Sequence, residues 1–207
     1  MVARVPSTSK PRTHTSFSPI FFPTRGEILS RGTVEVSISV QDCDQAREYS
    51  RLALERLSGP NYTGLHLPER FYVGRCGEIG FGYWAQENGL LIEDTVQRAG
   101  VPDEQDFLQH HIDGRILKLN VKNSHHPRAR YLMQPRDQYD KFRFDLYVGC
   151  SGRETDSGVD LTFWGAMTSC QFSRLSEEVQ VSILTLRYPL SGLPISMSEL
   201  RDKTKLL

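Results

Sequence analysis

The chain has 207 residues, the length of one domain of ordinary size or of one domain with extended ends. Its 25 basic and 25 acidic residues give zero net charge, which argues against a protein coated in positive charge for nucleic-acid or membrane binding but allows a local basic patch. No apolar run approaches the roughly 20 residues that cross a bilayer, and the N-terminus lacks the apolar core of a secretory signal. We therefore expect a cytoplasmic protein with no membrane association.

The N-terminal segment 1–25 is rich in proline, serine and threonine and contains no acidic residue. A stretch of this composition buries too little apolar surface to become ordered by itself. The sequence therefore predicts a flexible arm over 1–25, followed by a single domain over 26–207. The four cysteines lie far apart without a C-x-x-C pair, which favours reduced, mostly buried thiols over a zinc site or a disulfide framework.

Two elements follow the arm. Apolar and polar residues alternate over 33–40, which predicts a strand. Asp42 or Asp44 then fits the N-cap of a helix that ends near Gly59-Pro60. A loop is expected over 58–72, which is punctuated by Pro60, Gly64 and Pro68.

A second helix is expected over 75–88, although it contains three glycines. Each glycine weakens a helix by about 1 kcal/mol relative to alanine, so this helix is expected to bring its backbone close to a neighbouring element. The later segments predict short strands and one helix, the helix over 168–179 and the strands over 105–111, 115–122, 129–133, 143–150, 158–165 and 181–187. This order predicts an α/β (α+β) fold with a central mixed β-sheet flanked by helices.

The most informative segment is 103–122, where two strand-like runs meet at Asp113-Gly114. A two-residue turn would place Asp106 opposite Val121, on the other face from Asn120 and Lys122. A three-residue loop over 112–114, with Gly114 in the left-handed conformation, instead places Asp106 opposite Asn120 with Lys122 on the same face. The second arrangement is favoured because it leaves the apolar residues of both strands together on the reverse face.

At these residues the sequence resembles the PD-(D/E)XK nuclease superfamily, the restriction-endonuclease-like fold. That family places an Asp on one strand and a (Asp/Glu)-x-Lys triplet on the next, after a helix that often carries a Glu. Asp106 fits the first Asp, Asn120-Val121-Lys122 fits the triplet with one departure, and Glu78, at the expected start of the second helix, fits the helical Glu. The resemblance extends loosely from residue 34 to about residue 200.

The resemblance implies a metal-dependent DNA endonuclease that hydrolyses phosphodiester bonds. Asp106, Asn120 and Glu78 would hold a Mg²⁺ ion, with Mn²⁺ as a substitute, because hard cations take oxygen ligands. Lys122 would orient or deprotonate the attacking water. The segment 115–136 contains no acid, and its arginines and lysines are candidates for contacts to DNA phosphates: Arg115, Lys118, Arg128, Arg130 and Arg136. Cutting both strands would favour a homodimer, because two strands need two sites.

Asn120 is the departure from the family pattern, because an amide removes one negative charge from the metal site. Three explanations remain open: a natural variant that is active, a natural loss of activity, or an introduced Asp→Asn change. The surrounding residues favour an inactivating substitution.

The same residues also have less specific explanations. Asp106 and Lys122 fit a solvated ion pair between strands, and Glu78 fits an exposed acid favoured by the helix dipole. Asp103 and Glu104 are lesser candidates than Asp106. The paired histidines at 110–111 and 125–126 suggest zinc only weakly, because adjacent residues of a strand point to opposite faces. Two other functions therefore stand beside the nuclease: a DNA- or partner-binding module of the same fold without catalysis, and an interaction protein that does not bind nucleic acid.

Overall fold

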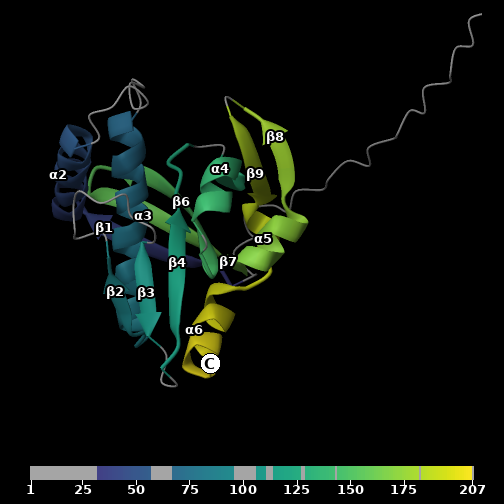
Figure 1. Cartoon of the computed structure of the whole chain (residues 1–207). Helices are drawn as coiled ribbons and strands as arrows, with labels where there is room; N and C mark the ends of the chain where they lie inside the picture. The colour runs from purple at the N-terminus through teal and green to yellow at the C-terminus, as the bar shows by residue number, and fades with distance from the viewer. Residues whose placement is uncertain are drawn as a thin grey trace, which may run out of the picture.

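The computed structural model describes residues 32–56, 67–95, 106–110, 114–126, 129–142, 144–181 and 183–206 (Figure 1). The expected N-terminal arm lies outside this part of the chain, and the domain boundary at residue 26 lies outside it as well. The elements in chain order are β1 (Val34–Ser39), α2 (Val40–Arg56), α3 (Leu67–Glu87), β2 (Ile92–Asp94), β3 (Phe107–His110), β4 (Ile116–Lys122), β5 (Tyr131–Pro135), α4 (Arg136–Lys141), β6 (Leu146–Thr155), β7 (Gly158–Thr168), α5 (Ser169–Leu175), β8 (Glu177–Gln180), β9 (Leu184–Pro189), the 3₁₀ turn η2 (Leu190–Gly192) and α6 (Met197–Leu206).

Two sheets organise these elements. The larger sheet has six strands in the order β1-β7-β6-β4-β3-β2, in which β4 and β6 run parallel and the other neighbours are antiparallel. The smaller sheet is antiparallel, with the order β5-β9-β8. The predicted mixed α/β class with helices beside a mixed sheet is therefore confirmed.

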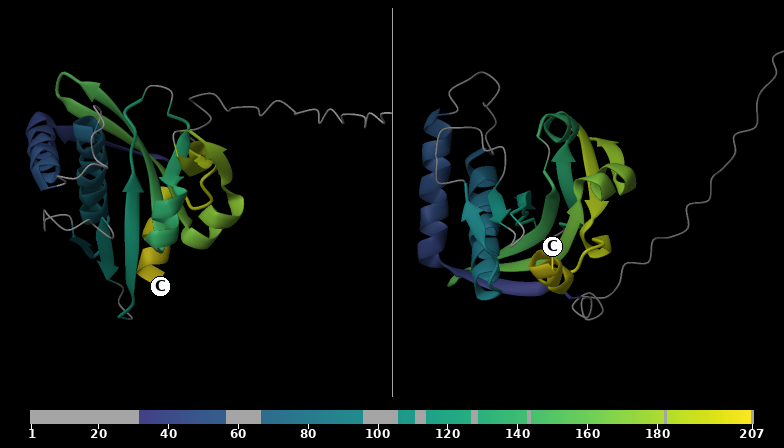
Figure 2. Two further views of the ribbon diagram at one scale, coloured as in Figure 1. Left: turned by 45° about the horizontal axis from the view of Figure 1, so that its top comes forward. Right: turned by 60° about the horizontal axis from the view of Figure 1, so that its bottom comes forward.

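The large sheet separates two apolar clusters, because successive side chains of a strand point to opposite faces. Helices α2 and α3 cover one face, where Phe81 and Trp84 of α3 pack with Phe107 of β3. The small sheet and α5 lie on the other side of the curled large sheet (Figure 2). There Tyr147 of β6 packs against Phe172 of α5 with ring centroids 4.8 Å apart.

The start of α3 differs from the prediction. The helix begins at Leu67 rather than near residue 75, and the first turn includes Pro68, where the missing amide hydrogen has no helical partner in any case. Glu78 is therefore in the interior of α3 and does not open a helix. The expected close approach of the helix backbone is confirmed, because a Cβ atom built on Gly77 would lie 2.6 Å from the Cβ of Asn123.

Other boundaries also differ from the prediction. Ser39 rather than Asp42 or Asp44 caps α2, because the Ser39 hydroxyl accepts a hydrogen bond from the Asp42 amide and the Asp42 carboxylate accepts one from the Ser39 amide. The helix expected over 168–179 ends at Leu175, and the strand β8 follows. The short elements β2 and α4 and the C-terminal helix α6 were not predicted.

Cys43, Cys76 and Cys150 are buried free thiols, as predicted, whereas Cys170 is exposed. Among the described residues, no helix is both long enough and apolar enough to pass through a lipid bilayer.

Candidate functional site

The hairpin of β3 and β4 has the predicted register. Phe107 pairs with Leu119 and Leu108 with Lys118, so Asp106 stands opposite Asn120 at the next position. Gly114 has a φ of +84°, the left-handed conformation expected at the third position of a three-residue loop. Residues 111–113 of that loop lie outside the described part of the chain.

The two faces of β4 are sorted as the register predicts. Leu119 and Val121 belong to the apolar cluster under α3. Across the parallel pair with β6, Asn120 lies beside Tyr147 and Lys122 beside Gly149. Asn120 and Lys122 therefore share the opposite face of the sheet.

Asp106 is bound directly to the strand that carries the triplet. Its amide donates a 3.0 Å hydrogen bond to the carbonyl of Leu119, and its Oδ2 atom accepts a 2.5 Å hydrogen bond from the amide of Val121. Its exposed fraction is 9%. Because Val121 separates Asn120 from Lys122, this contact fixes the Asp106 carboxylate beside the triplet.

Lys122 is electrostatically linked to both acids. Burial lowers the pKa of its ammonium group, while the charges of Asp106 and Glu78 oppose that shift. The Lys122 side chain is partly exposed and the charge of Asp106 acts on it, so an ion pair between the two residues stays an alternative explanation.

Glu78 lies in the middle of α3, the helix that covers the opposite face of the large sheet from Asn120 and Lys122. Its carboxylate is 3.0 Å from Nη1 of Arg75, whose Nη2 is 2.9 Å from Asp94 of β2. The side chain of Glu78 is only 12% exposed, so the alternative of an exposed acid at a helix N-terminus is wrong. Burial and the charge of Asp106 raise the pKa of Glu78 to about 8, although Arg75 acts in the opposite direction.

Asn120 has an unpaired polar atom. It is 5% exposed, and within the described structure its Oδ1 atom has no hydrogen-bond partner. A buried carbonyl oxygen without a partner costs about 1–3 kcal/mol, which is unusual in the interior of a protein. An amide oxygen is also a ligand that Mg²⁺ and Ca²⁺ accept.

The described side chains around Asn120 offer oxygen ligands of the kind a hard cation takes, but only two of them carry a negative charge. Among the described residues, no three His, Cys, Asp or Glu side chains are placed together to hold a metal ion. The available oxygen donors are the carboxylates of Asp106 and Glu78 and the amide of Asn120. Carboxylate and amide oxygens are of the kind that hard divalent cations take as ligands.

The predicted DNA-contacting residues do not form one surface of unpaired charge. Arg136, the first residue of α4, forms ion pairs with Asp140 and Glu178. Lys118 lies on the same face of β4 as Asn120, by alternation. Arg115 and Arg130 are exposed or partly exposed, and Arg128 lies outside the described residues.

Four residues of the site were not assigned a role from the sequence. Arg75 forms ion pairs with Glu78 and Asp94, and Asn123 directly follows Lys122. His125, a weak zinc candidate in the sequence, is largely buried; its Nε2 atom lies 3.2 Å from Nδ2 of Asn123 and its Nδ1 atom 4.0 Å from Glu154. The sequence shows an asparagine directly after the triplet, Asn123. It does not show that Asn123 hydrogen-bonds to Val73 of α3.

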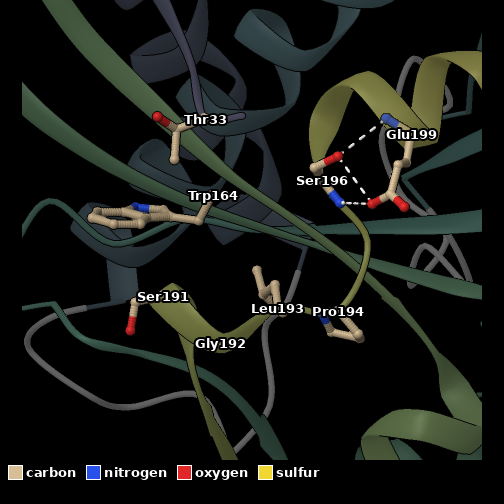
Figure 3. A pocket seen from close by; sticks show the side chains of 8 residues that line it. All are labelled: Thr33, Trp164, Ser191, Gly192, Leu193, Pro194, Ser196 and Glu199. Carbon is tan, nitrogen blue, oxygen red and sulfur yellow. Dashed lines mark hydrogen bonds between the residues drawn. The ribbon is translucent and has the colours of Figure 1, made fainter. Parts of the chain in front are cut away.

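A separate cavity of about 230 Å³ lies away from this cluster, between β7 and the start of α6 (Figure 3). Trp164, Leu193 and Pro194 are among its lining residues. Its one charged group, Glu199, accepts hydrogen bonds from the amide and hydroxyl of Ser196 and so caps α6. The cavity therefore lacks the convergent charged groups found in the cluster around Lys122.

Comparison of this chain with models of protein families, with curated proteins and with solved structures gives no match.

Proposed function

We propose that the protein is a metal-dependent DNA endonuclease of restriction-endonuclease-like fold whose metal site has one carboxylate fewer than the family pattern. The observation that supports the proposal is the hydrogen bond from the amide of Val121 to the Asp106 carboxylate, which keeps Asp106 beside Asn120 and Lys122. The charge of Asp106 also raises the pKa of Glu78 on α3, and the charges of Asp106 and Glu78 act on the ammonium group of Lys122. The resemblance implies this arrangement: a helix that carries a Glu, then a strand with an Asp at its start, then a strand with the x-x-Lys triplet.

Each residue has a definite part in this proposal. Asp106, Glu78 and the amide oxygen of Asn120 would hold Mg²⁺ or Mn²⁺, which would neutralise charge on the phosphate and lower the pKa of a bound water. Lys122 would orient the attacking water or accept its proton, a task helped by the burial that lowers its pKa. Arg115, Lys118 and Arg130 would contact the phosphates on either side.

The charge deficit at Asn120 supports a second candidate, a DNA- or partner-binding module of the same fold without catalysis. Its two carboxylates and one amide bind a divalent cation less tightly than three carboxylates would. DNA binding that does not depend on divalent metal would favour this module over the enzyme.

Cleavage of supercoiled plasmid DNA tests the proposal. We expect Asn120→Asp to nick or linearise the plasmid with Mg²⁺ or Mn²⁺, and the double variant with Lys122→Ala to leave it intact. Both residues lie on the same face of β4, so the second variant controls for the first. If Asn120→Asp neither binds Mn²⁺ nor cuts DNA, the enzyme proposal is wrong.

A further inference from the structure

We propose that Asn123 and His125 form a latch that positions Lys122 relative to Glu78. The catalytic consequence of this latch rests on the proposed function, whereas its structure does not. The latch joins the residue that follows Lys122 to the turn of α3 that carries Glu78.

The first contact of the latch is between Asn123 and the backbone of α3. The Nδ2 atom of Asn123 donates a 2.8 Å hydrogen bond to the carbonyl oxygen of Val73, one turn before Gly77. The glycine makes the approach possible, because a Cβ atom on Gly77 would lie 2.6 Å from the Cβ of Asn123. Gly77 and Glu78 are neighbours, as are Lys122 and Asn123, so one contact fixes both functional residues.

The second contact determines the protonation of His125. Because the carbonyl of Val73 only accepts, the group facing it must be the NH₂ of Asn123. The same Nδ2 atom lies 3.2 Å from Nε2 of His125, which must therefore accept the second hydrogen. The neutral ring then carries its proton on Nδ1, and burial favours the neutral form by lowering the pKa of His125.

The imidazole is held in place on its other sides. The ring of Tyr72, on α3, meets it edge-on with centroids 5.9 Å apart. A Cβ atom on Gly152 of β6 would lie 2.5 Å from the ring, so a second glycine provides its space. The amide of Gly152 also donates a 3.0 Å hydrogen bond to the carbonyl of Ser124. The segment after β4 is thus fixed to α3 and to β6, and Asn123 and His125 are positioning residues.

The tautomer of His125 tests the latch without any assay of activity. Two-dimensional ¹⁵N NMR of the full chain at neutral pH is expected to show His125 neutral and protonated on Nδ1. Asn123→Ala is expected to abolish this preference. A wild-type ring protonated on Nε2 would overturn the proposal, because Asn123 would then have no acceptor there.

Cleavage kinetics test the positioning role, with Asn120→Asp as the parent. Asn123→Ala and His125→Leu are expected to slow single-turnover cleavage about 10- to 100-fold while changing Mn²⁺ and DNA affinity by less than about twofold. His125→Gln is expected to retain most of the rate, because its amide oxygen can accept the hydrogen bond from Asn123.

Asn88→Ala is the matched control. Asn88 also donates a 2.8 Å hydrogen bond from Nδ2 to a carbonyl of α3, that of Trp84, but at the far end of the helix. A loss of rate as large in Asn88→Ala as in Asn123→Ala would mean that only stability is affected, and would overturn the positioning role.

Failure of the proposed function is distinguishable from failure of the latch. If the parent neither binds Mn²⁺ nor cuts DNA, the nuclease proposal is lost, and hydrogen exchange then decides the latch. Faster amide exchange over residues 121–124 in Asn123→Ala, and not in Asn88→Ala, would support the latch. Unchanged exchange in both variants would overturn it.

Discussion

At the scale of single residues, the charges around Glu78 oppose one another. Burial and Asp106 raise the pKa of Glu78 to about 8, while Arg75 counteracts them from 3.0 Å. Arg75 also reaches Asp94, so one guanidinium compensates two carboxylates from different elements. This arrangement gives Glu78 a pH dependence opposite to that of an ordinary paired acid.

The raised pKa of Glu78 predicts a loss of stability as pH increases. Below about pH 4.3, Glu78 is protonated in both the folded and the unfolded chain. Between about pH 4.3 and about pH 8, the unfolded chain loses this proton while the folded chain retains it. The contribution of Glu78 to the free energy of unfolding is therefore complete at low pH and falls across this window. We expect Glu78→Gln to gain stability relative to wild type as pH rises, measured by urea unfolding at several pH values. A difference between the two proteins that does not change with pH would contradict this account.

Removal of Arg75 is expected to be strongly destabilising. Arg75→Met leaves the carboxylates of Glu78 and Asp94 without their partner, and the loss of one member of a buried ion pair costs about 3 kcal/mol or more. Combining it with Glu78→Gln should recover part of the loss above about pH 8, where the Glu78 carboxyl would otherwise be charged. Equal destabilisation by the single and double variants in urea unfolding would mean that Arg75 does not act through Glu78.

At the scale of elements, α3 uses its glycines for different purposes. Gly77 provides space for Asn123, whereas a Cβ atom on Gly82 would meet nothing within 4 Å. Helix propensity favours alanine at both positions by about 1 kcal/mol. Any difference in stability between Gly77→Ala and Gly82→Ala must therefore come from the surroundings of the two residues.

We expect Gly82→Ala to raise the free energy of unfolding by about 0.5–1 kcal/mol, because the substitution reduces the entropy of the unfolded chain without a clash. Gly77→Ala should lower the free energy of unfolding, because Asn123 must move away from α3. Chemical denaturation of both variants gives the comparison. A stabilising Gly77→Ala would show that α3 and the end of β4 are not closely apposed.

The register of the hairpin was predictable because the two possible turns place its polar and apolar side chains on different faces. Only the three-residue loop sorted Asp106, Asn120 and Lys122 from the apolar residues, and Gly114 supplied the required conformation. The start of α3 was not predictable in the same way, because Pro68 resembles a loop signal and is equally compatible with a first helical turn.

The missed elements carry weak local signals. Strand β2 has only three residues and shows no alternation, and α4 has six residues and buries none of them. The boundary between α5 and β8 contains neither glycine nor proline. The pairs Arg75–Asp94 and Asn123–Val73 depend on tertiary packing, so residue spacing alone did not indicate them.

At the scale of the whole molecule, an aromatic cluster joins α4 and α5 to strand β6 of the large sheet. Phe172 of α5 is fully buried and contacts Tyr147 of the large sheet and Tyr139 of α4. Leu132 and Leu186 of the small sheet are buried in the same apolar cluster, so we expect Phe172 to help hold the small sheet beside the face that carries Asn120 and Lys122.

Phe172→Ala is expected to cost about 3–5 kcal/mol, the usual effect of removing a buried aromatic ring. Leu175→Ala, on the same helix but 45% exposed, is the control and should change stability by less than about 0.5 kcal/mol. Urea unfolding of the two variants tests this. Similar small effects for both would mean that the two sheets do not depend on this cluster.

The proposed metal site can be tested directly in crystals of Asn120→Asp grown with Mn²⁺. Anomalous diffraction is expected to place a manganese ion between the carboxylates of Asp106 and residue 120, on the face of β4 that carries Lys122. Crystals that contain no manganese there at a saturating concentration would contradict the account, as would carboxylates that point away from each other.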